Sequence, residues 1–234
     1  MISPVLLSEV VLPEDHPRAG SACMVFGFVV HHSEGPVLVD TGVGVGNRNI
    51  DSAFSPVHHS VDGALARIGV DRYDVRMVIN SHLHFDHCGN NGLFPGIAHV
   101  VQRAEYDQVH QEGYTISEWV DFRGSEWELV DGEVEVLPGI RVMPTPGHTP
   151  GHQSVVVTHS EGVDVIAAQA VYDPDEFETE ASTEPLTDAE AKATSESARR
   201  IKAVGPIRVF FSHDPRVWLR RGKRGDWPHP GSSN

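Results

Sequence analysis

The sequence predicts an α/β fold in which strands and helices alternate along two halves of the chain. Its 234 residues, 39% of them hydrophobic, are enough for the core of one large domain or two small ones. Apolar segments with strand character recur along the chain, and segments with helical character follow them. We expect a single domain over residues 1–234, in which 215–234 form a basic tail that contains Pro and Gly.

The first half is expected to begin with strands and to end with a helix. The strands are predicted from short apolar segments, and the helices from longer segments that follow them. In order, we expect strands at 5–11, 24–30 and 36–40, a helix over 62–68, strands at 77–80 and 98–101, and a helix over 103–111.

The second half is expected to consist of strands around one long helix. We expect a hairpin-like pair of strands at 133–137 and 140–144, strands at 154–158 and 163–168, a helix over 187–204 and a strand at 207–211. The helix has clear boundaries, because Thr187 and Glu190 match a capping box and Gly205-Pro206 follows its end.

The most informative segment is 82–87, which reads His-Leu-His-Phe-Asp-His. Three imidazoles and one carboxylate within six positions form a ligand set for divalent zinc, manganese or iron. The segment follows the strand expected at 77–80 and precedes a Gly-Asn-Asn-Gly turn at 89–92. We therefore expect it on a loop that leaves a strand, where a rigid scaffold can direct several ligands to one point.

Two later segments supply further histidines. Residues 145–152 read Thr-Pro-Gly-His-Thr-Pro-Gly-His and display His148, and His213 follows the apolar strand at 207–211. Together with the segment 82–87, they resemble the metallo-β-lactamase superfamily. That resemblance implies a four-layer αββα sandwich with metals at one edge of its two sheets.

The resemblance also implies the ligands of two metal ions. It assigns one ion to His82, His84 and His148, and the second ion to Asp86, His87 and His213. We expect one or two zinc ions, with manganese or iron as the alternatives, and no organic cofactor.

One position departs from the pattern of the superfamily. In its members the strand after the His148 loop ends in Gly-Asp, and that aspartate bridges the two metals. Here the strand expected at 163–168 is followed by Gln169. A glutamine amide is neutral and bridges two cations poorly, so Asp86 would be the only anionic protein ligand. We expect the second ion to bind more weakly, and the uncompensated charge to favour ionisation of bound water and capture of an anionic substrate.

Within the superfamily, the chain most resembles the N-acyl homoserine lactonases and related small lactonases. The shared features are the segment 81–87, the Gly-Asn-Asn that follows it, and Tyr172, three residues beyond the bridging position. The resemblance implies a hydrolase that opens a lactone or related ester by metal-bound hydroxide. It gives Asp86 a role in proton transfer, places Tyr172 against the carbonyl oxygen, and places Phe85 beside the substrate.

Two other classes of function stay open. The first is a tailoring enzyme of specialised metabolism, in which a metal acts as Lewis acid for a cyclisation, elimination or dehydration without net hydrolysis. Loss of the bridging carboxylate at Gln169 would suit that chemistry. The second is a catalytically inactive binding protein, against which the six ligand-type residues argue.

Composition limits the partners and the compartment. A net charge of −15 argues against nucleic acid, whose binding needs a basic face. Because the sequence has neither a long apolar segment nor a secretory start, we expect no membrane partner. The two cysteines, Cys23 and Cys88, are expected to be reduced in a cytoplasmic protein, with Cys88 packed beneath the metal loop. The expected partner is a small-molecule substrate, and a homodimer stays open.

Overall fold

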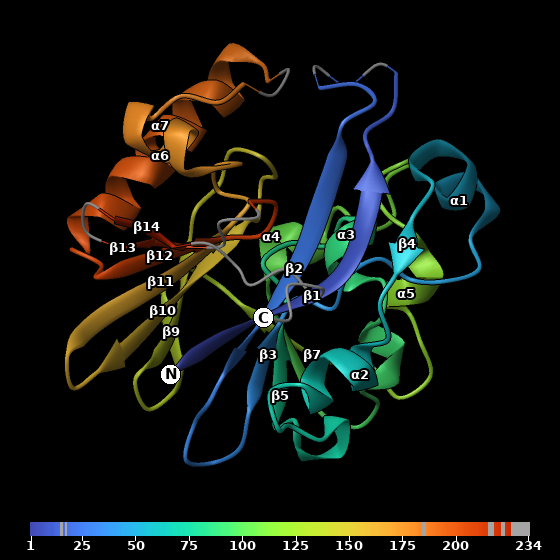
Figure 1. Cartoon of the computed structure of the whole chain (residues 1–234), viewed down its shortest axis with the longest axis horizontal. Coiled ribbons are helices and arrows are strands. Elements are labelled where there is room, and N and C mark those ends of the chain that lie inside the picture. Colours follow the sequence, from blue (N-terminus) through green and yellow to red (C-terminus); the bar gives the residue numbers. More distant parts are fainter. Residues whose placement is uncertain (15, 17, 184–185, 215–217, 221–222, 226–234) are drawn as a thin grey trace, which may run out of the picture.

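The chain folds into two facing β-sheets with helices on their outer sides (Figure 1). The computed structural model describes residues 1–14, 16, 18–183, 186–214, 218–220 and 223–225. Each sheet contains seven strands, in the orders β4-β1-β2-β3-β5-β6-β7 and β14-β13-β12-β11-β10-β9-β8. This arrangement confirms the predicted α/β sandwich. In the part of the chain that is described, no helix is long and apolar enough to cross a membrane.

The first sheet combines an antiparallel and a parallel part. Its strands are β1 (Ile2–Val11), β2 (Ala22–Val30), β3 (Val37–Val39), β4 (Val57–His58), β5 (Met77–Ile79), β6 (Ala98–Gln102) and β7 (Glu126–Val130). The pairs from β4 to β3 are antiparallel, and those from β3 to β7 are parallel. In the parallel part, successive strands end at the same edge of the sheet.

The second sheet is antiparallel except for one pair. Its strands are β8 (Val134–Leu137), β9 (Ile140–Pro144), β10 (Gln153–His159), β11 (Gly162–Ala168), β12 (Arg208–Phe211), β13 (Trp218–Arg220) and β14 (Lys223–Gly225). The parallel pair is β11 and β12, which two helices connect. The sequence predicts a tail over residues 215–234, but 218–220 and 223–225 form β13 and β14, which extend this sheet. The other residues of that range lie outside the described residues.

Apolar side chains fill the space between the sheets. Phe28 from β2 and Phe210 from β12 meet edge to face, with their ring centroids 5.8 Å apart. They belong to one buried cluster with alternate residues of both sheets, including Phe26 and Val30 from β2. Because β2 and β11 are also buried on their outer faces, their sequences are almost continuously apolar.

Helices cover both outer faces. The α-helices are α1 (Arg48–Phe54), α2 (Val61–Ala66), α3 (Phe85–Cys88), α4 (Arg103–Tyr106), α5 (Ser117–Val120), α6 (Pro174–Thr179) and α7 (Asp188–Ala203), with 3₁₀ turns η1 (Arg72–Asp74) and η2 (Asn91–Leu93). α2 packs on the first sheet through Leu65, and α7 packs on the second through Ala198 and Ile201. The predicted capping box of Thr187 and Glu190 is present at the start of α7.

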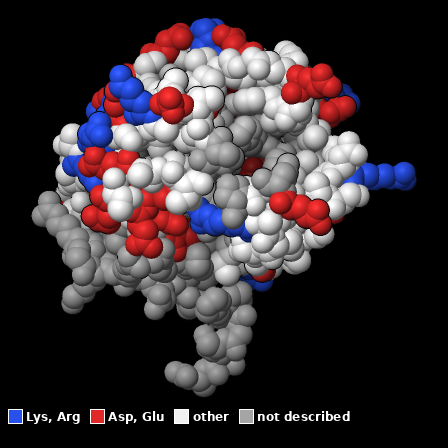
Figure 2. All heavy atoms as spheres, turned by 90° about the horizontal axis from the view of Figure 1, so that it is seen from above, with Lys and Arg blue, Asp and Glu red and all other residues white. Residues whose placement is uncertain are grey.

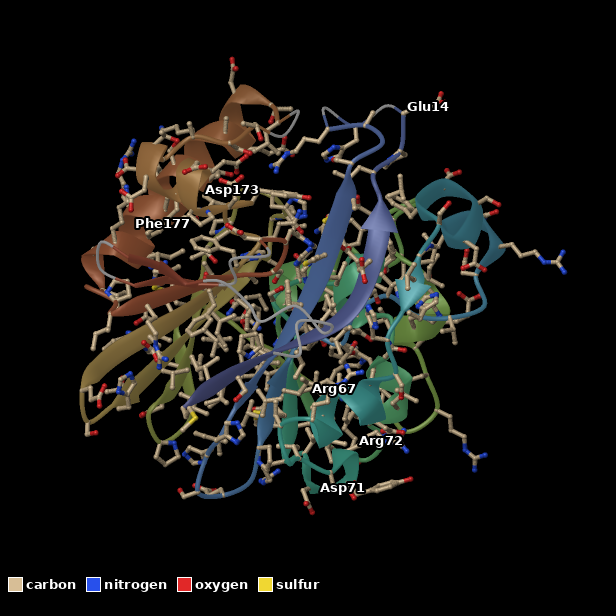
Figure 3. The ribbon with its side chains drawn as sticks, in the orientation of Figure 1. Glu14, Arg67, Asp71, Arg72, Asp173 and Phe177 are labelled. Carbon is tan, nitrogen blue, oxygen red and sulfur yellow. The ribbon has the colours of Figure 1, made fainter. Side chains whose placement is uncertain are left out.

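Two elements of the structure depart from what their local sequence suggests. The acidic segment before α7 lacks lysine and arginine and has the composition of a loop, yet it forms α6. Asp173 caps this helix by accepting hydrogen bonds from the backbone N–H groups of Asp175 and Glu176, and Phe177 is buried against the second sheet (Figure 3). The helix expected over 103–111 ends at Tyr106, because the next residues form tighter turns with i to i+3 hydrogen bonds.

The face seen in Figure 2 carries charges of both signs. Acidic side chains form separate groups there, and the basic side chains drawn in blue lie among them without joining into one patch. This distribution agrees with the net charge of −15 and offers no basic surface for phosphates on that face.

His99 is a buried base within an aromatic cluster. Its ring on β6 lies 5.2 Å from Phe122 and 5.4 Å from Trp127, and its Nδ1–H donates to the carbonyl of Ile97. Its Nε2 has no hydrogen-bond partner among the described residues. Burial lowers the pKa of His99 to about 4, so the folded protein holds this ring neutral where the unfolded chain protonates it.

His99 is therefore expected to make stability fall as the pH drops. Between the unfolded pKa of 6.5 and the folded value of about 4, the unfolded chain binds the extra proton. The free energy of unfolding should lose at most about 1.4 kcal/mol per pH unit from this residue. Urea unfolding at about pH 7.5 and about pH 5 should show a smaller loss for His99→Gln than for the wild type. Equal losses in the two proteins would contradict this assignment.

Candidate metal centre

The predicted ligand residues lie together at one edge of the two sheets. The segment 80–87 leaves the end of β5, the loop 145–152 joins β9 to β10, and Gln169 and His213 follow β11 and β12. The expectation that the whole six-residue motif lies on a loop is wrong in its second part, because Phe85–Cys88 form α3 (Figure 1).

The first cluster consists of three histidines. The ligand nitrogens of His82, His84 and His148 lie within 4.8 Å of one another. His84 Nδ1 is 3.0 Å from His148 Nε2, and the ring centroid of His82 is 4.7 Å from that of His84 and 4.9 Å from that of His148. Such a set matches the three protein ligands of a tetrahedral metal site with one open position.

The environment of His82 fits a metal ligand. Its Nε2 is buried and has no hydrogen-bond partner in the described part of the chain, although its Nδ1 lies 3.1 Å from Ser81 Oγ. Burial lowers the pKa of His82 well below its ordinary value. Electrostatic repulsion from the neighbouring imidazoles, His87 first among them, lowers it further. The ring is therefore neutral and keeps a lone pair, as coordination requires.

The second cluster contains the carboxylate of Asp86. Its Oδ2 lies 3.6 Å from Nε2 of His87 and 3.6 Å from Nε2 of His213, and the three ligand atoms lie within 4.8 Å of one another. Burial alone would raise the pKa of Asp86, but His87 and His213 lower it below its ordinary value. Asp86 is therefore ionised and can ligate a cation.

Gln169 lies at this second cluster. Its side-chain oxygen is 3.2 Å from Nε2 of His87 and 3.2 Å from Nε2 of His213. The rings of His82 and His87 are 4.0 Å apart, so the two clusters adjoin. The chain thus presents a neutral amide oxygen beside the two histidines of the second cluster.

Asp40 orients His87, and it was not among the residues that the sequence pointed to. It follows β3 with a φ of 62°, and its Oδ2 accepts hydrogen bonds from His87 Nδ1 at 2.8 Å and from Ser81 Oγ at 2.7 Å. With Nδ1 protonated in this way, His87 turns Nε2 toward the cluster. The available signal was an acidic residue directly after a short buried strand.

His152 is a second residue that the sequence did not assign. Its ring is fully buried, 5.3 Å from that of His82. However, its Nδ1 pairs with Thr145 Oγ1 at 2.9 Å, and its Nε2 accepts the backbone N–H of Gln169. His152 therefore supports the strand end that carries Gln169 and is not a member of either cluster.

Both clusters border a cavity of about 160 Å³. Its lining residues are Val10, Leu12, His16, Cys23, Phe54, His84, Phe85, Asp86, His148, Gln169, Tyr172 and His213. The lining includes ligand residues of both clusters, and the rings of Phe54 and Phe85 lie 4.5 Å apart in its apolar wall. A carbonyl group with an apolar substituent suits such a cavity.

Tyr172 borders this cavity. The ring stacks on His213 with centroids 5.2 Å apart, and the guanidinium of Arg18 lies 3.6 Å from the ring centroid. The hydroxyl is 3.0 Å from Cys23 Sγ. Burial raises the pKa of Tyr172, so the phenol keeps its proton and can donate a hydrogen bond.

The two cysteines are free and buried. Cys88 lies outside both ligand clusters, and its thiol donates a hydrogen bond to the carbonyl of Leu83 within the metal-loop core. Burial raises the pKa of Cys88 to about 12, which leaves the thiol protonated.

Comparisons with known proteins agree with this geometry. The sequence profile of the metallo-beta-lactamase superfamily matches residues 20–213. An N-acyl homoserine lactonase of a Bacillus species is 34% identical over 208 residues, which cover 81% of each chain. The N-acyl homoserine lactonase AttM of Rhizobium radiobacter is 30% identical over 217 residues, or 82% of each chain.

Solved structures show the same fold. An N-acyl homoserine lactone hydrolase with the product N-hexanoyl-L-homoserine at its catalytic metal centre superposes with a TM-score of 0.76. It is 27% identical, and the match covers 91% of this chain and 92% of that one. A probable metal-dependent hydrolase from Staphylococcus aureus reaches a TM-score of 0.81 at 17% identity, covering 97% and 95% of the two chains, which speaks for the fold alone.

Proposed function

Because the chain belongs to the metallo-beta-lactamase superfamily, we propose that it is a metal-dependent hydrolase that opens a lactone ring. The observation that carries this proposal is the pair of adjoining ligand clusters on one cavity with an apolar wall. The relatives that are 33% to 34% identical are N-acyl homoserine lactonases, so lactones with an N-acyl chain are the first substrates to test.

The ligands divide between two sites. One ion would be held by His82, His84 and His148, and a second by Asp86, His87 and His213. Zinc suits these nitrogen and carboxylate donors. When bound, such cations polarise a carbonyl group and make water acidic enough to ionise near neutral pH.

The protein's own side chains supply the remaining steps. Tyr172 donates a hydrogen bond to the lactone carbonyl oxygen, and this bond strengthens as that oxygen becomes an oxyanion. Asp86 is a carboxylate, so it can accept the proton of the attacking water and pass it to the leaving ring oxygen. Phe85 and Phe54 hold the apolar substituent and keep bulk water from that wall.

The test is hydrolysis by the purified chain. With N-hexanoyl-L-homoserine lactone, we expect ring opening that releases acid, stops after chelation and returns when zinc is added. Product mass should exceed substrate mass by one water. A zinc-loaded protein that opens no lactone in a panel of short- and long-chain N-acyl lactones would overturn the proposal.

A second candidate function rests on Gln169. A neutral amide at the second cluster suits a single cation that polarises substrate without net hydrolysis, as in a cyclisation, elimination or dehydration. Such an enzyme would convert its substrate without the addition of water. The mass of the product therefore separates it from the lactonase.

The organisation of the chain is also a proposal. We infer one domain over the whole chain, because segments that follow strands of both sheets supply each ligand cluster. The free thiols of Cys23 and Cys88 support a cytoplasmic location.

A further inference from the structure

Glu105 is a buried carboxylate that belongs to neither ligand cluster. It lies on α4, directly after β6, and its side chain is 0% exposed. An ionised carboxylate in such a place is costly unless several donors surround it. Most of the donors around Glu105 come from the segments that carry the first cluster.

Four hydrogen bonds reach this carboxylate. Oε1 accepts the backbone N–H of Leu83 at 2.9 Å and also the hydroxyl of Tyr114. Oε2 accepts the hydroxyl of Thr149 at 2.7 Å and the backbone N–H of Gly151 at 3.2 Å. Each oxygen thus accepts two bonds.

These donors connect two distant parts of the chain. Leu83 lies between His82 and His84, whereas Thr149 directly follows His148. One carboxylate therefore joins the segment that carries two of the three histidines to the loop that carries the third. Tyr114, which donates to the same carboxylate, also packs its ring 5.0 Å from that of His84.

The loop 145–152 packs directly against the start of α4, where Glu105 lies. A Cβ atom added to Gly151 would lie 2.1 Å from the backbone nitrogen of Glu105, so only glycine allows the contact. The four donors also demand an acceptor-only group. A glutamine in this place would turn an NH₂ group toward two of them.

We propose that Glu105 is a positioning residue for the three-histidine site. It fixes the distance between the His82–His84 segment and the His148 loop, so that the three imidazoles are aligned before a metal binds. This inference rests on the proposed metal role of those histidines. Groups that orient metal ligands typically change metal affinity by about 10- to 100-fold when they are replaced.

The test compares metal binding by the wild type, Glu105→Gln and Thr149→Val, all as full chains. Thr149→Val keeps the side-chain shape and removes one donor, so it serves if Glu105→Gln does not fold. We expect zinc affinity, measured by competition with a chelating indicator, to fall by about 10- to 100-fold in Glu105→Gln and by less in Thr149→Val. The absorption bands of the cobalt(II)-loaded protein should change in the same order.

Leu65→Ala is the matched control. Leu65 is fully buried in the cluster beneath α2, so its truncation lowers the melting temperature without touching the ligand loops. Unchanged affinity and cobalt spectrum in both test variants would overturn the inference, as would an equal loss of affinity in Leu65→Ala. A wild type that binds no metal would instead overturn the proposed function.

Discussion

Tyr172→Phe is expected to lower kcat for lactone opening by about 10²- to 10³-fold, the usual cost of losing one hydrogen-bond donor to an oxyanion. The substitution removes only the hydroxyl. The phenyl ring can keep its stacking on His213 and its contact with Arg18, so the melting temperature and the metal content should barely change. The loss should appear mainly in kcat, because the hydrogen bond strengthens as charge develops on the carbonyl oxygen.

Rate and melting temperature must be measured together. Tyr106→Phe is the control, because this hydroxyl is removed from a half-buried ring that packs on Trp127 and does not border the cavity. An unchanged kcat in Tyr172→Phe, or a loss that follows the melting temperature, would leave Tyr172 with only a packing role in the buried cluster that contains Val10 and Cys23.

The ligand-type residues could be predicted from sequence because they are concentrated in short motifs. His82, His84, Asp86 and His87 lie within six positions, and the loop of His148 is marked by Pro and Gly. The metal roles of these residues stay proposals, but the fold brings their side chains together as the resemblance implied. The predicted strands also match well where the chain is buried on both faces, because continuous apolar composition identifies such strands.

The supporting residues could not be predicted in the same way. Asp40 is 47 positions from His87, and Glu105 is 44 positions from Thr149. Their roles depend on which segments meet in space, and neither residue has a local spacing pattern. An isolated acidic residue in a sequence is usually exposed, so only the fold distinguishes these buried carboxylates.

Local elements were missed where a few contacts outweigh composition. α6 has an acidic sequence with the character of a loop, but the Asp173 cap, Pro174 at the first turn and the buried Phe177 together stabilise a short helix. α3 is only four residues long, too short for any helical period to be visible in the sequence. α3 also borders the proposed site, where ligand geometry outweighs local preference.

The second cluster contains a single negatively charged side chain. Asp86 is the only carboxylate in the two ligand sets, and the oxygen beside His87 and His213 belongs to the neutral Gln169. We therefore expect unequal occupancy, with the site of His82, His84 and His148 the fuller. Two tightly held metals per chain that resist mild chelation would contradict this.

Gln169→Asp is expected to raise the affinity for the second metal by at least about 10-fold, since it adds a negative charge beside His87 and His213 of the second cluster. Gln169→Asn is the matched control, because it has the length of aspartate without the charge and should not raise the affinity. Elemental analysis after mild chelation and calorimetric titration of zinc measure the effect.

The same variant distinguishes the two candidate functions. If the chain is a lactonase with a weakened second site, Gln169→Asp should raise lactone hydrolysis together with the second-metal affinity. If the native reaction needs one polarising cation, the variant should lose that reaction while the fold and both metals persist. No change in affinity or in activity would mean that Gln169 does not face the second ion, and that another residue bridges the metals.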